Sequence, residues 1–328
     1  MTYALLFPGQ ASQYVGMGRD VAGEWESADK VFEIADECTG LPVRRLCFGG
    51  PAEELAMIVN LQPCMVAVSI AMLAAACEEA GVRQPDEFDL RRFRQPPAFT
   101  AGHSVGEYSA LAASGALSVE DCLELVAFRG RVMEEAGRRR PGTMLALLSG
   151  TTEAATRLCS DIRESVGGSY LDVANYNSPE QVVVAGDLES VALARRRASE
   201  YGFRRAVPLR VSGAFHTSAM LPASSEMQGR LLAVLLGDPG IPVVGNIEGR
   251  PLGDAAAVRR ELPAQLASPV RWGESMGFIE SNGVRDFVEV GPGQVLSRLA
   301  ARSVDGAEAT TAGDVDGVRR LARRLEGN

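Results

Sequence analysis

The sequence has few of the residues that bind nucleic acids or metal ions. It contains a single lysine, Lys30, among 33 basic residues, and its formal net charge is −9. Because phosphate binding needs a basic surface, this balance argues against a nucleic-acid partner. There are only two histidines, and no two of the six cysteines form a C-x-x-C pair. We therefore expect no metal site.

The cysteines also show no sign of a disulfide framework. They are spread through a chain of 328 residues whose first residues form an apolar segment, and we expect no secretory leader. We expect six reduced thiols and a location in the cytoplasm. We also expect no apolar run to approach the roughly 18 residues of a membrane-spanning helix. No membrane partner is predicted.

What is present is the composition of a globular protein. Hydrophobic residues make up 46% of the chain and charged residues 23%, which excludes a disordered chain, a collagen-like repeat and a coiled coil. The length favours two domains, or one large domain with an insertion.

The first part of the chain has the pattern of an α/β domain. Tyr3–Phe7 is a short apolar run stopped by Pro8 and Gly9, which predicts a buried strand. Ser118, with Asp121 three residues later, predicts a helix start. The other elements expected here are helices through about Cys38, a buried helix over Pro63–Glu79, a charged surface loop over Asp86–Pro97, a strand over Ala98–Ala101, a helix over Glu107–Ser114, and an end near Ala136 for the helix that Ser118 caps.

After Arg138 the pattern becomes regular and predicts a small inserted domain. The order of elements is β-α-β-β-α-β, the split βαβ of ferredoxin-like domains. The strands are expected at Met144–Leu148, Tyr170–Ala174, Gln181–Ala185 and Arg205–Leu209, and the helices at Thr152–Val166 and Leu188–Tyr201. The chain then returns to the large domain, with strands at Val243–Asn246 and Asp286–Val290, a loose linker at Ser303–Gly313 and a last helix at Val315–Leu325.

The strongest chemical signal is the segment Gly102–Gly106, with the sequence GHSVG. A G-x-S-x-G pattern between a strand and a helix predicts a nucleophile elbow, a sharp turn that exposes the hydroxyl of Ser104. The following helix directs its positive N-terminal end at the serine. The backbone N–H of Val105 is then placed to bind an oxyanion that forms when an acyl carbonyl is attacked. The alternative is a glycine-rich structural turn.

A serine nucleophile needs a base, and the two histidines leave one candidate. His103 is adjacent to Ser104 in the turn, where neighbouring side chains point apart. His216 is therefore the expected base, and a buried structural histidine is the alternative. No acidic residue is obviously placed to orient His216. A histidine oriented by a backbone carbonyl is as plausible as a full triad.

Arg129 is the third informative residue. Cys122, Leu125, Val126, Arg129 and Met133 recur at helical spacing, which places the arginine on the apolar, inward stripe of its helix. A buried guanidinium keeps its charge and needs an anionic partner. From the residues alone, a structural ion pair with a carboxylate of this chain and a grip on a substrate carboxylate are equally supported.

Several ordered motifs together resemble the malonyl-CoA:acyl carrier protein transacylase family, which includes the bacterial fatty-acid enzymes and stand-alone acyltransferases of polyketide synthases. The resemblance extends over nearly the whole chain. Ala11 stands where the family usually has glycine. The segments that carry the resemblance are LFPGQASQ at 6–13, QP at 62–63, GHSVGEYSAL at 102–111, RGR at 129–131, NYNSPEQVVVAG at 175–186, GAFH at 213–216, Asn246, QLASPVRW at 265–272 and EVGPGQ at 289–294.

The resemblance implies a fold and a set of roles. The fold is an α/β-hydrolase-like catalytic domain at 1–138 and 210–328, with the ferredoxin-like small domain at 139–209. Ser104 would carry the acyl group, and His216 would act as base and then acid. Gln10 and the Val105 amide would form the oxyanion hole, and Arg129 would hold the malonyl carboxylate. The Gln265 main-chain carbonyl would orient the histidine, and the residues expected to line or support the site are Gln62, His103, Met133, Asn175, Phe215 and Gln265.

The implied activity is transfer of malonyl from malonyl-CoA to the phosphopantetheine thiol of an acyl carrier protein, for a polyketide synthase or, alternatively, for fatty-acid synthesis. No tightly bound cofactor and a monomer are expected.

In related polyketide enzymes, a phenylalanine immediately before the histidine accompanies selection of malonyl, and a serine there accompanies selection of methylmalonyl. Phe215 therefore favours malonyl; its alternative role is core packing. An acyl hydrolase of the same fold, a transferase for larger uncharged acyl groups and a catalytically idle docking module are the competing functions. Arg129 disfavours the first two, and the intact set of motif residues disfavours the third.

Overall fold

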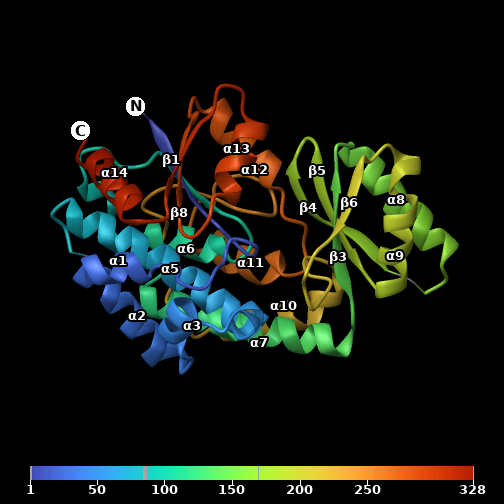
Figure 1. The fold of residues 1–328 in the computed structure, drawn as a ribbon, viewed down its shortest axis with the longest axis horizontal. Helices are drawn as coiled ribbons and strands as arrows, with labels where there is room; N and C mark the ends of the chain where they lie inside the picture. The colour runs from blue at the N-terminus through green and yellow to red at the C-terminus, as the bar shows by residue number, and fades with distance from the viewer. Residues whose placement is uncertain (1, 84–86, 169, 328) are drawn as a thin grey trace.

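The computed structural model describes residues 2–83, 87–168 and 170–327 and places them in two lobes, each built on its own β-sheet (Figure 1). The larger sheet has the strand order β7-β2-β1-β8-β9, and every neighbouring pair in it is parallel. Its strands are β1 (Tyr3–Phe7), β2 (Phe99–Gly102), β7 (Val243–Val244), β8 (Asp286–Val290) and β9 (Glu308–Ala312).

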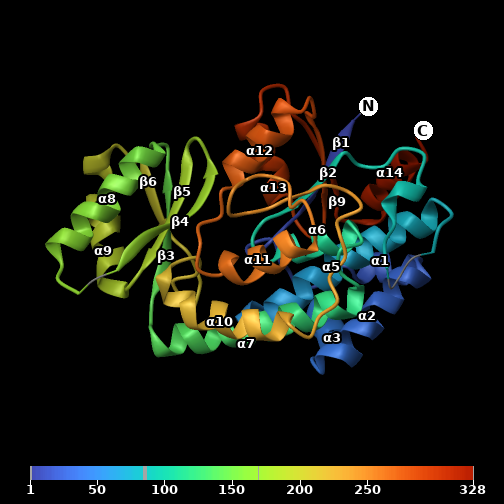
Figure 2. The same cartoon turned by 180° about the vertical axis from the view of Figure 1, so that it is seen from behind.

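Both faces of the larger sheet are covered by helices, as Figures 1 and 2 show from opposite sides. In β1, Tyr3, Leu5 and Phe7 face one hydrophobic cluster, whereas Ala4 and Leu6 face another. A parallel strand buried on both faces is apolar throughout rather than alternating, which explains the continuous YALLF run. Helices α12 (Trp272–Ser281) and α13 (Val295–Ser303) supply the Ala4 side. The Tyr3 side is supplied by α1 (Arg19–Glu24), α2 (Glu26–Thr39), α3 (Val43–Gly49), α4 (Ala52–Ala56), α5 (Ile58–Glu79), α6 (Gly106–Ala113), α7 (Val119–Arg139), α10 (Leu221–Leu231), α11 (Ala255–Gln265) and α14 (Val315–Glu326).

Helix α5 corrects two expectations from the sequence. It begins at Ile58 instead of Pro63, so the proline lies inside its N-terminal part and Gln62 belongs to the helix. It has 22 residues and is apolar enough, by length and composition, to cross a membrane, which contradicts the expectation that no apolar run approaches that length. In the fold, however, 89% of its most apolar window is buried. A helix packed on all sides must be apolar all round.

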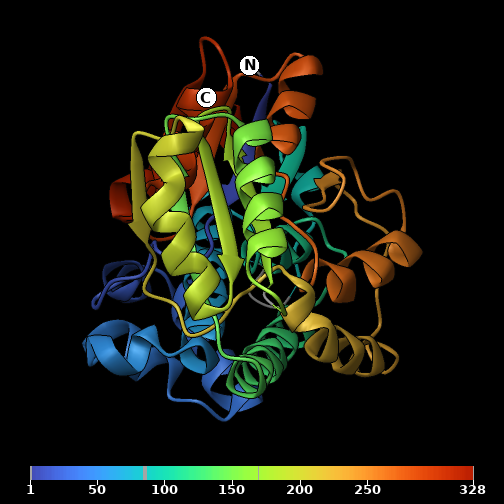
Figure 3. The ribbon, with the colours of Figure 1, turned by 90° about the vertical axis from the view of Figure 1, so that its right-hand side faces the viewer.

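The smaller sheet is antiparallel and has the order β4-β5-β3-β6. Helices α8 (Thr152–Ser165) and α9 (Leu188–Arg197) lie across its outer face (Figure 3). Leu145 and Leu147 point to those helices, whereas Met144 and Ala146 point toward the larger lobe. The predicted β-α-β-β-α-β order is confirmed. Its elements are β3 (Thr143–Leu148), α8 (Thr152–Ser165), β4 (Leu171–Ser178), β5 (Gln181–Gly186), α9 (Leu188–Arg197), the 3-10 turn η2 (Ala198–Tyr201) and β6 (Arg205–Pro208).

Other boundaries differ from the sequence-based expectations. The predicted linker at Ser303–Gly313 contains β9, which pairs in parallel with β8 at the edge of the sheet. Thr310 is exposed, Ala309 and Thr311 are partly buried, and only Ala312 is fully buried, so the strand gives no apolar run. Helix α7 continues past Ala136 to Arg139, and the predicted strand at Val243–Asn246 is limited to β7. Helices α10 to α13 had not been delimited from the sequence.

The predicted surface loop at Asp86–Pro97 is also more structured than expected. Asp86 lies outside the described residues. The rest contains the 3-10 turn η1 (Leu90–Arg92), which Asp89 caps by accepting from the backbone N–H of Arg91. Phe88, Leu90 and Phe93 are buried in the core that surrounds α5. Charged residues between these three side chains hid their apolar pattern.

The loop after β1 holds a non-glycine residue in the left-handed region. Ala11 has φ 82°, a conformation that costs an L-residue about 1–2 kcal/mol. Since glycine itself loses about 0.5–1 kcal/mol of conformational freedom on folding, we expect Ala11→Gly to stabilise the fold by about 0.5–1 kcal/mol. The measurement is the urea midpoint of unfolding. The matched control is Ala192→Gly, at an exposed position in α9, which we expect to destabilise by about 1 kcal/mol; equal shifts for both variants would contradict the strain argument.

Candidate active site

The Gly102–Gly106 turn connects β2 to α6 and has the geometry of a nucleophile elbow. Ser104 has φ 53°, in the left-handed region that a serine adopts only where the surroundings hold it. A Cβ on Gly102 would lie 2.0 Å from the carbonyl oxygen of Gly106, and a Cβ on Gly106 would lie 2.1 Å from the carbonyl oxygen of Phe7. Both glycines are therefore required by contact with backbone, and the alternative of a turn without an exposed hydroxyl is not observed.

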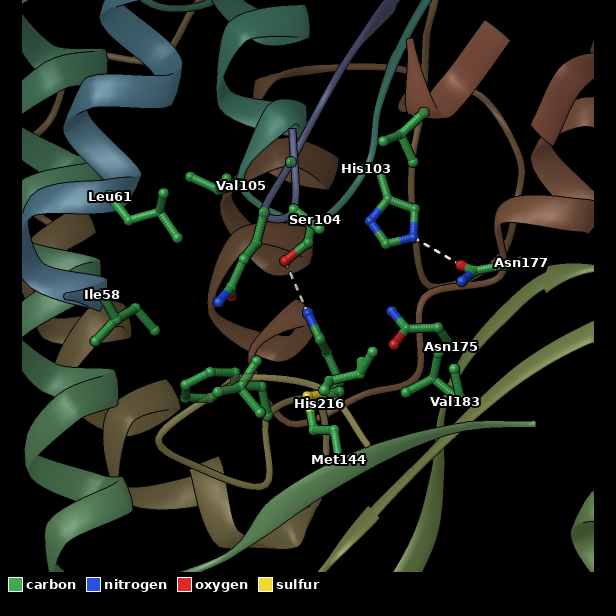
Figure 4. Close-up of a pocket in the computed structure, with 18 of the residues that line it drawn as sticks. Ile58, Leu61, His103, Ser104, Val105, Met144, Asn175, Asn177, Val183 and His216 are labelled. Carbon is green, nitrogen blue, oxygen red and sulfur yellow. Dashed lines mark hydrogen bonds between the residues drawn. The ribbon is translucent and has the colours of Figure 1, made fainter. Parts of the chain in front are cut away.

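Ser104 and His216 form a hydrogen-bonded pair, drawn as a dashed line in Figure 4. Ser104 Oγ lies 2.8 Å from His216 Nε2, and His216 Nδ1 lies 2.9 Å from the carbonyl oxygen of Gln265. A carbonyl only accepts, so Nδ1 carries the proton and Nε2 is free to accept from the serine hydroxyl. Of the two arrangements that the sequence left open, the structure contains the one with a backbone carbonyl.

Burial fixes the protonation state of this histidine. The His216 side chain is removed from water and lies near the positive charge of Arg129, and these two effects lower its pKa to about 3. Both effects disfavour the imidazolium form. His216 is thus a neutral hydrogen-bond acceptor for Ser104 throughout the physiological pH range.

Arg129 lies in α7 and is the only fully buried charged side chain that reaches Ser104 among the described residues, with 1% of its surface exposed. Its Nη1 donates to Gln62 Oε1 at 2.8 Å, and its Nη2 donates to Gln265 Oε1 at 2.8 Å and to Ser104 Oγ at 3.2 Å. These partners are all neutral. In the described parts of the chain no acidic side chain forms an ion pair with Arg129, so the structural ion pair considered from the sequence is absent there.

The three side chains open onto one cavity of about 290 Å³ between the two lobes. Figure 4 shows Ile58 and Leu61 of α5 on one side of it and Met144 and Val183 of the small sheet on the other. Asn175 lies beside them. Of the residues predicted from the sequence for the site, all but Gln265 line this cavity. Gln265 is buried behind His216 and Arg129. The predicted residues that line the cavity are Gln10, Gln62, His103, Ser104, Val105, Arg129, Met133, Asn175, Phe215 and His216.

The predicted divergence of the two elbow side chains is also observed. His103 points away from Ser104, and its Nε2 lies 2.8 Å from the side-chain oxygen of Asn177 (Figure 4). Burial lowers the pKa of His103 as well. Its role is to tie the elbow to β4 of the small sheet, since Asn177 belongs to that strand.

Two buried residues to which the sequence patterns assign no role, Asn246 and Glu107, support the elbow on the side away from the cavity. The side-chain oxygen of Asn246 accepts from the backbone N–H of Ser104 at 2.8 Å, and its Nδ2 donates to the carbonyl of Gly102 at 2.7 Å. Glu107 accepts from the backbone N–H of Asn246 at 2.9 Å. Asn246 belongs to a quoted motif, but nothing in the sequence links a residue 142 positions away to Ser104. Glu107 stands in the first turn of α6, where an acidic residue ordinarily faces solvent.

This arrangement can activate a serine hydroxyl and hold an anionic group beside it. His216 can take the proton of Ser104, and the N–H of Arg129 that reaches Ser104 Oγ lies at the cavity surface. A guanidinium offers several N–H groups in one plane, which suits a carboxylate. In the described residues, no group of three or more His, Cys, Asp or Glu side chains is placed to hold a metal ion, and the six cysteines are free thiols.

Comparison with known proteins gives one consistent family. The acyl transferase domain family matches residues 4–320. The malonyl CoA-acyl carrier protein transacylase of Bacillus subtilis (strain 168) is 39% identical over 299 residues, 91% of this chain and 89% of that protein. The crystal structure of the acyl-carrier-protein S-malonyltransferase from Bartonella henselae is 34% identical, with TM-score 0.91 and full coverage of both chains. A structure of a type II polyketide synthase acyl carrier protein in complex with its malonyl-transacylase is 34% identical, with TM-score 0.89 and full coverage of both chains.

The low pKa of His216 predicts how the reactivity of Ser104 depends on pH. Free histidine loses its base form below pH 6.5, whereas His216 keeps it down to about pH 3. We expect the rate at which a fluorophosphonate labels Ser104 to change less than about twofold between pH 5 and 8, because the fraction of neutral His216 is constant there. The measurement is labelling by intact mass after brief exposure to each pH. His216→Ala is the control that removes the base, and an acidic limb near pH 6.5 would contradict the buried, neutral state.

Proposed function

Because the chain belongs to the malonyl-CoA:acyl carrier protein transacylase family, we propose that it moves a malonyl group from malonyl-CoA to the phosphopantetheine thiol of an acyl carrier protein through an ester on Ser104. The observation that carries this proposal is the position of Arg129. A buried cation that forms no ion pair with any carboxylate in the described part of the chain lies within hydrogen-bond distance of the nucleophile. Malonyl is an acyl group that brings its own carboxylate.

The chemistry proceeds in two acyl transfers. In the first, His216 Nε2 takes the proton of Ser104 as Oγ attacks the thioester carbonyl, and the backbone amides of Gln10 and Val105 are the proposed donors to the oxyanion. The tetrahedral intermediate then collapses, the carbon–sulfur bond breaks, and His216 returns the proton to the departing CoA sulfur. In the second, His216 takes the proton of the carrier thiol, which attacks the malonyl ester, and Ser104 leaves with that proton.

Arg129 is proposed to hold the malonyl carboxylate while the ester exists. Gln62 and Gln265 grip the guanidinium through neutral amide oxygens, so they orient it and leave its charge for the substrate. The carboxylate also offsets the field that Arg129 exerts on His216, which makes the histidine a stronger base when malonyl is bound. An acyl hydrolase and a transferase for larger uncharged groups have no use for a buried arginine here, which disfavours these alternatives.

Further parts of the proposal follow from the family and from the two sheets. We propose domain limits of 1–138 with 210–328 for the catalytic domain and 139–209 for the small domain. We also propose that the protein is cytoplasmic, is a monomer and has no tightly bound cofactor. The acyl carrier protein is proposed to belong to a polyketide synthase, in line with the relative crystallised with such a carrier; service in fatty-acid synthesis is the alternative, in line with the bacterial relatives.

The test of the proposed function is the intact mass of the protein after brief mixing with malonyl-CoA or with acetyl-CoA. We expect one malonyl adduct on the wild type, none on Ser104→Ala, and a loss of about 10- to 100-fold in loading rate for Arg129→Ala, since a lost hydrogen bond to a charged group costs about 1.5–3 kcal/mol. Holo carrier protein should discharge the adduct. Acetyl loading as fast as malonyl, or rapid discharge by water alone, would instead favour the acyl hydrolase.

Phe215 yields a separate prediction about substrate selection. Its ring is buried, lines the cavity and immediately precedes His216, so it is placed to crowd a branch on the α-carbon of the acyl group. We expect Phe215→Ser to raise the ratio of methylmalonyl to malonyl loading by about 10- to 100-fold, the range that one methyl group provides in a tight pocket. Competition between the two CoA esters, followed by mass, measures this ratio. Phe203→Ser, in the core of the small domain, is the control for loss of a buried ring; the same ratio in both variants would mean that Phe215 only packs.

A further inference from the structure

We propose that Glu107 is a positioning residue that sets the orientation of the Gln265 amide and thereby keeps the Arg129 guanidinium aimed at the substrate carboxylate. The inference rests on the proposed function of Arg129. Glu107 lies in the first turn of α6, is fully buried, and does not touch the cavity. It is connected to the cavity through the residues to which it is hydrogen-bonded.

One oxygen of Glu107 faces donors that cannot be reversed. Oε1 accepts from the backbone N–H of Asn246 at 2.9 Å and from its Nδ2 at 3.2 Å. A backbone N–H is always a donor, and the Asn246 side chain is held by Ser104 N–H on its oxygen and by Gly102 on its nitrogen. Position 107 must therefore present an acceptor on this side.

The other oxygen of Glu107 and the backbone carbonyl of Ser104 together set which way the Gln265 amide faces. Oε2 accepts from Gln265 Nε2, which also donates to the backbone carbonyl of Ser104 at 2.9 Å. With its nitrogen committed to these two acceptors, Gln265 turns its Oε1 toward Arg129 and accepts from Nη2 at 2.8 Å. The direction of each hydrogen bond is thus fixed: Asn246 and Gln265 donate to Glu107, and Arg129 donates to Gln265.

Through these contacts Arg129 has a hydrogen-bond acceptor, the amide oxygen of Gln265, and no carboxylate of the described residues touches it. A carboxylate placed directly on the guanidinium would compete with the malonyl carboxylate. Glu107 is instead separated from Arg129 by the Gln265 amide. The two side chains interact electrostatically over this distance, without direct contact. The cation is oriented, yet the N–H that reaches Ser104 Oγ remains available to a ligand.

The neighbouring carboxyl of Glu261 does not alter the argument. Burial and the proximity of Glu261 raise the pKa of Glu107, while the N–H donors of Asn246 and Gln265 oppose this rise. Glu261 accepts separately from the backbone N–H of Ile247 at 2.8 Å. Each carboxyl oxygen has two lone pairs, so a proton held between Glu107 and Glu261 still leaves an acceptor facing Asn246 and an acceptor facing Gln265.

Glutamine at position 107 distinguishes positioning from general support, because it keeps the shape and replaces one acceptor by a donor. Its oxygen must face Asn246, so its NH₂ group faces Gln265. The NH₂ group of Gln265 then faces a donor instead of an acceptor; if the Gln265 amide reverses, its oxygen faces the Ser104 carbonyl and its NH₂ group faces Arg129. Either orientation weakens the contact that orients Arg129. We expect Glu107→Gln to slow malonyl loading from malonyl-CoA by about 10- to 100-fold, mainly through KM, and to change fluorophosphonate labelling of Ser104 less than about threefold.

The matched control is Glu261→Gln, which removes the adjacent carboxylate without contacting Gln265; we expect malonyl loading within about threefold of the wild type. If Glu107→Gln slows malonyl loading and fluorophosphonate labelling equally, or slows neither, the positioning role is overturned. If wild type itself does not load malonyl, the proposed function fails, and the amide orientation is tested separately by the variant that follows.

The double variant Glu107→Gln with Gln265→Glu restores a donor facing an acceptor and also gives Arg129 an acceptor. We expect the double variant to lose less Tm than the sum of the losses in the two single variants. Malonyl loading should stay low, because a carboxylate now lies on the guanidinium. If Glu107→Gln alone does not fold, we expect the double variant to fold, and a double variant that also fails to fold would contradict the proposed orientation. Additive changes in Tm, or malonyl loading restored to the wild-type rate, would contradict the proposed orientation.

Discussion

A guanidinium that keeps its charge inside the protein is the constraint on which the active site depends. Burial disfavours the charged form of Arg129. An ion pair would offset this cost, but its carboxylate would occupy the guanidinium that is proposed to bind the substrate. The fold instead surrounds the arginine with amide oxygens from α5 and α11. Such oxygens stabilise and orient a cation but leave its net charge in place. Burial, and after it the same charge, lower the pKa of His216 and keep that histidine neutral.

The elbow and the histidine are held by backbone geometry more than by side-chain packing. Ser104 and His216 both have positive φ angles. The backbone N–H of Ser104 is held by the side-chain oxygen of Asn246, and His216 Nδ1 is held by the main-chain carbonyl of Gln265. A Ser–His pair oriented by a peptide carbonyl needs no buried acid in contact with the imidazole. The acidic residue of the site, Glu107, is displaced to the far side of the Gln265 amide, where it orients the network without occupying the cavity.

The two lobes divide the work of building the cavity. The large lobe carries the chemical groups on the turn after β2, on α7 and on the segment that leads to η3 (Ser218–Met220), and the small sheet supplies an apolar wall through Met144 and Val183. His103 joins the lobes through Asn177. The inner face of the small sheet closes the site, so it carries the apolar side chains of Met144 and Val183 together with the amides of Asn175 and Asn177.

Local patterns in the sequence were sufficient for the elements that carry a strong local signal. β1 and β8 appear at the predicted residues, the β-α-β-β-α-β order is confirmed, and Ser118 caps its helix. G-x-S-x-G located the elbow because both glycines are required by contacts within a few residues of the turn or with β1. The strand β9 and the buried residues around η1 were missed, since an edge strand and a charged loop over a core have no continuous apolar pattern.

For the site, the sequence determined which residue types were available, and the tertiary structure decided how they are joined. With two histidines, His216 was the only base to consider, and helical spacing put Arg129 inside. Whether the arginine had a carboxylate partner, and whether a carbonyl or an acid oriented the histidine, stayed open because both depend on residues more than 40 positions away. Only the packing of α5, α7 and α11 brings Gln62, Arg129 and Gln265 together, and only that packing places Glu107 behind them. Hydrogen-bond direction depends on such contacts, and no local pattern records it.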